Sequence, residues 1–93
     1  MPSASAIVLT AVPDRYAQQL LAHLGRKPAI QLRAETLIFG YGTATVRAKT
    51  DRLVLRVEAP DPESLARLED VVARHLIRFG RRAELVVNWR PDA

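Results

Sequence analysis

Hydrophobic residues recur at helical spacing in two stretches of this 93-residue chain, and each stretch begins at a proline and ends at a glycine. The stretches cover residues 13–24 and 62–79. Proline suits the first position of a helix because its missing N–H has no helical partner there, and glycine commonly follows the last turn. Asp61 stands where a capping side chain is expected. The sequence therefore predicts two amphipathic helices.

Outside these stretches, apolar residues alternate with polar ones, as in strands that bury one face. We expect strands over residues 5–12, 30–34, 37–48, 53–59 and 83–89. Within residues 37–48 the apolar side chains move from odd to even positions. A bulge at Gly40 or Gly42 would absorb this change, because glycine tolerates the backbone angles that a bulge often needs.

The order β-α-β-β-β-α-β predicts an α+β fold. We expect a two-layer sandwich in which an antiparallel sheet of about five strands carries both helices on one face, as a variant of the ferredoxin-like arrangement. The order of the strands within the sheet is left open. The length predicts a single domain over residues 1–93, with an ordered core at about residues 5–90.

Composition excludes several classes of protein. The chain has no cysteine, so it cannot form disulfides, and it offers no thiolate as a nucleophile or as a zinc ligand. No apolar run is long enough to cross a membrane, and the first residues do not resemble a secretion signal. We therefore expect a cytoplasmic protein with no membrane partner. The net charge of +4 is compatible with an acidic partner.

Two histidines are candidates for ligand binding. His23 and His75 each lie at the boundary of the apolar stripe of a helix, neither in its centre nor opposite to it. Two imidazoles from adjacent helices could bind a metal ion or haem. The pair has no third ligand beside it in the sequence and does not match the His-x-x-x-His spacing of metal sites, so no metal site is assigned.

Catalytic patterns are missing from the sequence. None of Ser3, Ser5 and Ser64 lies in a nucleophile-elbow motif. The glycine-rich residues 39–43 match no phosphate-binding loop. No pair of carboxylates reads as a general acid and base. We expect a protein that is not an enzyme and needs no cofactor.

The outer face of the sheet is predicted to carry several arginines. The candidates for contact with an anion or a partner are Arg33, Arg47, Arg56 and Arg90. The face could be solvated, with cross-strand pairs such as Arg56 with Glu84 or Glu58 with Arg90. It could instead be covered by a protein partner or a second copy, or bind nucleic acid. Nucleic acid is the least favoured partner because exposed aromatic residues for base stacking are few.

Several segments resemble one bacterial family. These are residues 55–61 (LRVEAPD), 68–72 (LEDVV), 74–79 (RHLIRF) and 84–89 (ELVVNW), with Phe39 and residues 42–44 in the middle of the chain. Together they are similar to the bacterial domain of unknown function 2218 family over residues 5–90. The stretch from His75 to Trp89 is the most specific part.

The resemblance implies no catalytic residue, because the family has no established activity. Some relatives resemble an appendage to siderophore-interacting, flavin-dependent ferric reductases, which makes iron acquisition the context to test. The family-like candidates for ligand binding are His23, His75, Arg78 and Trp89. We therefore expect a small non-enzymatic binding or accessory domain whose partner is a small molecule, a protein or a second copy. The alternatives are a haem- or metal-binding protein and a nucleic-acid-binding protein.

Overall fold

The two helices begin at the prolines that the sequence indicates. A computed structural model describes residues 2–92, so the first and last residues of the domain expected over 1–93 lie outside it. Helix α1 spans Pro13–Gly25 and helix α2 spans Pro62–Phe79. The Asp61 carboxylate accepts a hydrogen bond of 2.8 Å from the Ser64 amide and so caps α2 as predicted.

The sheet has six strands instead of the expected five, and their order is β2-β3-β4-β5-β1-β6. The strands are β1 (Ser3–Leu9), β2 (Gln31–Arg33), β3 (Thr36–Phe39), β4 (Gly42–Ala48), β5 (Arg52–Glu58) and β6 (Arg90–Pro91). All neighbouring strands are antiparallel. The order β6-β1-β5-β4 with two crossing helices is ferredoxin-like, and the β2–β3 hairpin extends the sheet beyond β4.

The sixth strand arises because residues 37–48 form a hairpin and not one bulged strand. Phe39 pairs with Gly42, so Gly40 and Tyr41 make a tight turn between β3 and β4. Residues directly opposite each other share a face of the sheet, and here each odd residue of β3 faces an even residue of β4. The hairpin therefore produces the change from odd to even positions without a bulge, and the predicted bulge is wrong.

The end of the chain also differs from the prediction of a strand over residues 83–89. A 3-10 turn, η1 (Arg81–Ala83), follows α2, and Glu84 adopts a left-handed conformation with φ 52°. This reversal leads the chain along β1 from the helix layer, and ladder pairing is reached only at β6. The side chains still alternate as a strand would have them, with Leu85 buried and Val86 exposed.

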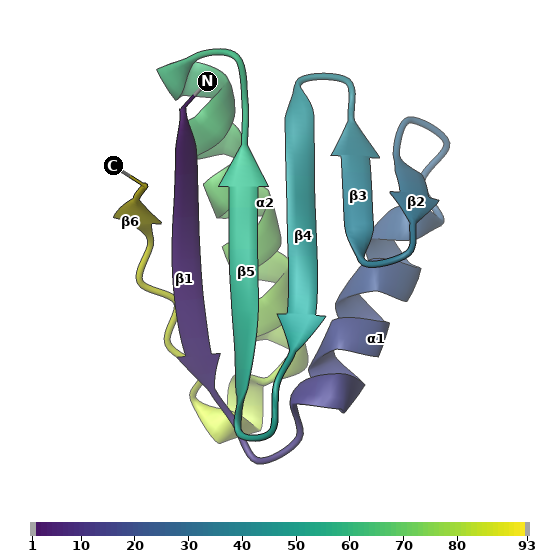
Figure 1. Ribbon diagram of the computed structural model, residues 1–93. Helices are drawn as coiled ribbons and strands as arrows, with labels where there is room; N and C mark the ends of the chain where they lie inside the picture. Colours follow the sequence, from purple (N-terminus) through teal and green to yellow (C-terminus); the bar gives the residue numbers. More distant parts are fainter. Residues whose placement is uncertain (1, 93) are drawn as a thin grey trace.

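Both helices pack on the same face of the sheet (Figure 1). The inward side chains of β1, β3, β4 and β5 form the core with the apolar stripes of the helices, which include Leu20, Leu24, Leu68, Val72 and Leu76. This arrangement confirms the predicted two-layer sandwich. None of the helices within residues 2–92 is both long and apolar enough to cross a bilayer.

Candidate binding pocket between the helices

A pocket of about 420 Å³ lies where the end of α1, the β3–β4 turn and the middle of α2 meet. We call it the α1–α2 pocket. It is lined by Leu24, Lys27, Ala29, Ile30, Phe39, Gly40, Tyr41, Val71, Arg74 and His75. Most of these side chains are apolar or aromatic, three are basic, and none carries a carboxylate. Such a pocket favours a ligand with an apolar body and a negative charge.

Helix α2 contributes one face to this pocket. Val71, Arg74 and His75 stand three and four residues apart, so their side chains project from the same side of the helix. Arg74 has an ion pair with Asp70 one turn earlier, at 3.7 Å, and both side chains are well exposed. An exposed pair of this kind contributes little free energy, so it leaves Arg74 able to turn towards a ligand.

The opposite wall is aromatic. The rings of Phe39 and Tyr41 flank the β3–β4 turn with their centroids 5.6 Å apart. The guanidinium carbon of Arg67 lies 4.3 Å from the centre of the Tyr41 ring, which is a cation–π contact between α2 and the turn. This contact holds the Tyr41 ring beside the pocket, and it brings a further positive charge close to it.

The two histidines are in contact, and of the two only His75 lines this pocket. The ring centroids of His23 and His75 are 5.3 Å apart, and His23 also contacts the ring of Phe79 edge-on at 5.4 Å. His75 Nδ1 lies 2.7 Å from the carbonyl oxygen of Val71. A neutral ring must donate from Nδ1 to make that hydrogen bond, which leaves the lone pair on Nε2.

The electrostatic surroundings of His23 are positive. Partial desolvation lowers the pKa of His23 below its usual 6.5, and the charges of His75, Lys27, Arg26 and Arg78 lower it further. The neutral form of the ring is therefore favoured. Within residues 2–92, the structure brings together no group of three or more histidine, aspartate or glutamate side chains that could hold a metal ion.

The other two predicted ligand-binding residues lie elsewhere. Arg78 lines a separate hollow at the end of α2, with Tyr16, Phe79 and η1. Trp89 precedes β6, at the opposite edge of the sheet from the β2–β3 hairpin. Its indole Nε1 is buried and has no hydrogen-bond partner within the described part of the chain. The structure thus unites His23 with His75 but does not place Trp89 in the same pocket.

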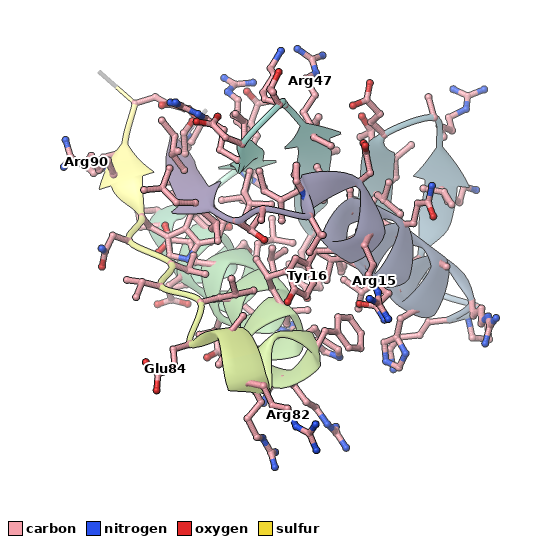
Figure 2. All side chains as sticks on the ribbon, turned by 90° about the horizontal axis from the view of Figure 1, so that it is seen from below. Arg15, Tyr16, Arg47, Arg82, Glu84 and Arg90 are labelled. Atoms are coloured by element: carbon pink, nitrogen blue, oxygen red, sulfur yellow. The ribbon has the colours of Figure 1, made fainter. Side chains whose placement is uncertain are left out.

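Acidic side chains accompany the arginines on the outer face of the sheet. Arg47 faces Glu35 at 3.8 Å, and Arg56 approaches Glu58 at 3.5 Å and Asp92 at 3.4 Å. Arg56 therefore pairs within its own strand and with the end of the chain, not with Glu84 as expected. Figure 2 shows Arg47 on the side of the sheet away from the helices and Arg82 at the opposite, helical side.

The remaining two candidates of that face are at the edges of the sheet. Arg33 lies on β2, the strand at one edge, and Arg90 lies on β6 at the other. Arg47 and Arg56 line one hollow of about 250 Å³ on the neighbouring strands β4 and β5, but the four arginines do not all gather in one cluster. Glu84, the possible partner of Arg56 on this face, precedes β6 and belongs to no strand.

Comparison with known proteins gives one family. Residues 5–90 match the family described as an uncharacterized protein conserved in bacteria, DUF2218. The chain belongs to the DUF2218 family. This DUF2218 protein is also similar to PA4090 from Pseudomonas aeruginosa, whose structure was determined by NMR. The two share 30% identity over 97% of this chain and 96% of the other, with a TM-score of 0.77. No curated protein matches this chain.

Several residues of the pocket in this DUF2218 domain were not singled out from the sequence. Phe39 and Arg74 enter the sequence analysis only through the family resemblance, and Lys27 and Tyr41 are not named there as candidates. The spacing of Val71, Arg74 and His75 was the available signal, because it places a basic and an apolar residue beside the candidate histidine. The pairing of β3 with β4 had to be known before the opposite wall could be located.

Proposed function

We propose that this DUF2218 domain is a non-enzymatic binding domain. Its ligand would be a small anion with an apolar or aromatic body, held in the α1–α2 pocket. The observation that carries the proposal is the lining of the pocket: Lys27, Arg74 and His75 surround an apolar floor that contains no carboxylate. Protein pockets for small molecules combine such a floor with a few well-placed polar groups.

The chemistry of the lining gives each part of the ligand a place. The apolar body would pack on Ile30, Phe39 and Val71, where leaving water is favourable. Carboxylate, catecholate or phosphate oxygens would accept hydrogen bonds from Lys27 and Arg74, and hydrogen bonds between charged groups are stronger than neutral ones. The lining offers no nucleophile with an adjacent base, which supports a role in binding and not in catalysis.

Iron acquisition is the setting that we propose for this binding. Many siderophores combine aromatic catecholates or carboxylates with a net negative charge, and haem combines two propionates with an apolar ring. Both belong to the class of ligand that the pocket favours. The resemblance of some relatives to appendages of siderophore-interacting ferric reductases supports the same setting, by analogy alone.

The histidine pair favours haem as a second candidate ligand. His75 lines the pocket, and its hydrogen bond from Nδ1 to the Val71 carbonyl leaves a free electron pair on Nε2. Histidines that bind metals usually donate their other ring N–H to a backbone carbonyl or a carboxylate in this way. His23 is near enough to approach the same ligand. No observation favours nucleic-acid binding by the outer face, and we do not propose it.

Isothermal titration with haemin and with a ferric catecholate siderophore tests the proposal. Replacing Lys27 and Arg74 together with glutamine should weaken binding at least about tenfold, which corresponds to about 1.4 kcal/mol. Lys49→Gln is the matched control, because Lys49 lies in the β4–β5 turn and does not line the pocket. The proposal would be contradicted if neither haemin nor the siderophore bound. It would also be contradicted if the double variant bound them as tightly as the parent protein does.

The haem candidate has a separate readout. Coordination by His75 would shift the Soret band of haemin, and His75→Gln would remove the shift while the basic residues still bind the propionates. If the Soret band did not shift with the parent protein, coordination by histidine would be rejected. The proposal of anion binding would then be judged by the isothermal titration alone.

A further inference from the structure

A second hollow lies at the end of α2, and it shares no lining residue with the α1–α2 pocket. We call it the arginine hollow. Its volume is about 530 Å³, and it is lined by Tyr16, Arg78, Phe79, Gly80, Arg81, Arg82 and Ala83. None of these residues is acidic. The sequence singles out Arg78 as a candidate for ligand binding, and the structure places that residue here and not beside the histidines' pocket.

Close packing fixes the backbone that carries the arginines. A Cβ added to Gly80, which follows α2, would overlap Leu85 Cδ1 and lie 3.4 Å from Tyr16 Cε1. Leu85 is itself part of the hydrophobic core. The Ala83 amide donates a hydrogen bond of 2.9 Å to the Gly80 carbonyl and closes η1. The arginines of η1 therefore project from a turn that is held against both α1 and the core.

The three arginines of this hollow have no acidic partner. Within residues 2–92, no carboxylate lies at ion-pair distance from the guanidinium groups of Arg78, Arg81 or Arg82. Glu84 is the first acidic residue after them, but it lines the hollow beside β1. Figure 2 shows Glu84 pointing away from Arg82. The charges of the three guanidinium groups are therefore available to a bound anion.

The end of helix α2 explains only part of this positive charge. The partial negative charge at a helix C-terminus favours a cation in the last turn, and Arg78 occupies that turn. The effect falls off beyond the last turn, and Arg81 and Arg82 lie in η1, after the helix has ended. Without an anion these like charges repel one another, so an anion bound between them would relieve the repulsion.

Two aromatic residues complete the lining. Tyr16 and Phe79 are both half-buried, so part of each ring is packed and part is accessible. The Phe79 ring is held by an edge-on contact with His23, with the ring centroids 5.4 Å apart. Nucleic-acid bases stack on such rings. Guanidinium groups bind phosphate oxygens through paired hydrogen bonds, and arginine is the side chain best suited to that recognition.

We propose that the arginine hollow binds a nucleoside di- or triphosphate. The guanidinium groups of Arg78, Arg81 and Arg82 donate hydrogen bonds to the oxygens of adjacent phosphate groups. The base packs against Tyr16 and Phe79 at the aromatic side of the hollow. This site goes beyond the ligand proposed for the α1–α2 pocket, and neither proposal depends on the other.

A single nucleotide fits this surface better than a strand of nucleic acid. The volume of the hollow lies within the range of small-molecule sites. A strand needs a basic track that continues beyond one site, because its affinity comes from many phosphate contacts. Here Arg74 is already paired with Asp70, at 3.7 Å, on one side of the hollow, and Glu84 follows η1 on the other.

Isothermal titration with ATP, at low ionic strength and without divalent ions, tests the proposal. We expect saturable binding by the parent protein. Arg81→Gln with Arg82→Gln should weaken it at least about tenfold, because hydrogen bonds between charged groups are lost. Arg33→Gln with Arg90→Gln is the matched control: it removes the same charge from two exposed arginines that do not line the hollow, and it should bind ATP as the parent does.

The variants of the α1–α2 pocket distinguish the two sites. Lys27→Gln with Arg74→Gln should leave ATP binding unchanged, whereas Arg81→Gln with Arg82→Gln should leave the binding of haemin and the siderophore unchanged. Loss of ATP binding in the Lys27 and Arg74 variant would place the nucleotide in the α1–α2 pocket and overturn this proposal, without bearing on the other ligand.

Tripolyphosphate, titrated in place of ATP, tests the role of the base. We expect ATP to bind at least about fivefold more tightly, because stacking on an aromatic ring adds to the phosphate contacts. Tyr16→Leu should reduce this difference. The proposal would be overturned by the absence of ATP binding, by an equal loss in the control variant, or by tripolyphosphate binding as tightly as ATP. Tighter binding of a single-stranded oligonucleotide through Arg81 and Arg82 would also overturn it.

Discussion

His75 Nδ1 lies 2.7 Å from the carbonyl oxygen of Val71, one helical turn earlier on α2. This contact fixes the plane of the imidazole, and it decides which nitrogen of the neutral ring can accept a hydrogen bond or bind a metal. It leaves Nε2 as the free nitrogen of a residue that lines the α1–α2 pocket. The proposed role of His75 depends on this orientation.

The neutral ring of His75 should therefore carry its proton on Nδ1. Long-range ¹H–¹⁵N correlation spectra, recorded where the ring is uncharged, distinguish the two tautomers directly. We expect a protonated Nδ1 and an unprotonated Nε2. A proton on Nε2 would show that the Val71 contact is not formed in solution, and it would remove the argument for haem coordination by His75.

The pH dependence of stability should contain a contribution from His23. Its pKa in the folded protein is lowered, by partial desolvation first and then by His75, Lys27, Arg26 and Arg78. The unfolded chain therefore binds a proton more readily than the folded one. The contribution of His23 to the stability of the fold is fully present above pH 6.5. It is lost as the pH falls from 6.5 through the lower pKa of the folded state.

Replacing His23 with glutamine checks this prediction. The melting temperature of the variant should fall less than that of the parent as the pH is lowered through this window. A proton NMR titration of the His23 ring should give a midpoint below 6.5. A midpoint at or above the usual value would show that the positive surroundings do not act on this ring.

Gly42 is predicted to be the glycine that tolerates substitution least. Its φ is +154°, and an added Cβ would lie 2.5 Å from both the Glu58 carbonyl oxygen and Leu68 Cδ1. Backbone strain and overpacking should together cost Gly42→Ala about 3 kcal/mol. Thermal unfolding should show a decrease of more than about 10 °C in the melting temperature.

Gly40, in the same turn, is the matched control. An added Cβ there meets no heavy atom within 4 Å, so Gly40→Ala should change the free energy of unfolding by no more than about 0.5 kcal/mol. Similar melting temperatures for the Gly40 and Gly42 variants would show that the β3–β4 turn is not packed against β5 and α2 as described.

Asp92 is predicted to hold the end of the chain on the sheet. Its carboxylate accepts hydrogen bonds from Ser3 at 2.8 Å, Ser5 at 3.0 Å and Arg56 at 3.4 Å. The bond from Ser3 is the largest cause of its lowered pKa, with Ser5 and Arg56 adding to it. The contribution of the Asp92 carboxylate to stability is thus present above pH 3.8. It is lost as the pH falls through the lower pKa of the folded state.

Asp92→Asn should loosen β6 without unfolding the domain. We expect faster exchange of the Asp92 and Arg90 amides at neutral pH, with unchanged exchange in β5. In acid, where the carboxylate of the parent is protonated, the two proteins should become alike. Equal exchange at neutral pH would contradict the role assigned to Asp92.

The sequence predicted the elements whose boundaries are set locally. Pro13, Asp61 and Pro62 mark both helix starts, because a proline or a capping carboxylate acts within one turn. The β3–β4 hairpin was missed because a change of parity fits either a bulge or a two-residue turn, and only the pairing partner decides between them. That choice is made by packing between distant segments.

The same limit applies to the site. His75 was found from residue type, and its proximity to His23 follows from how α1 and α2 pack side by side, which no local pattern contains. Trp89 was grouped with the histidines although β6 returns to the far edge of the sheet. Residues 83–89 kept the alternation of a strand, but the left-handed Glu84 sends them along a path that meets β1 only at its end.

Chemical-shift mapping by NMR tests the central claim, ligand binding in the α1–α2 pocket, most directly. The ¹⁵N-labelled protein would be titrated with a diamagnetic gallium complex of a catecholate siderophore. We expect the amides of Lys27, residues 39–41 and residues 71–75 to shift together and saturate. No shift, or shifts confined to the outer face of the sheet around Arg47 and Arg56, would contradict it.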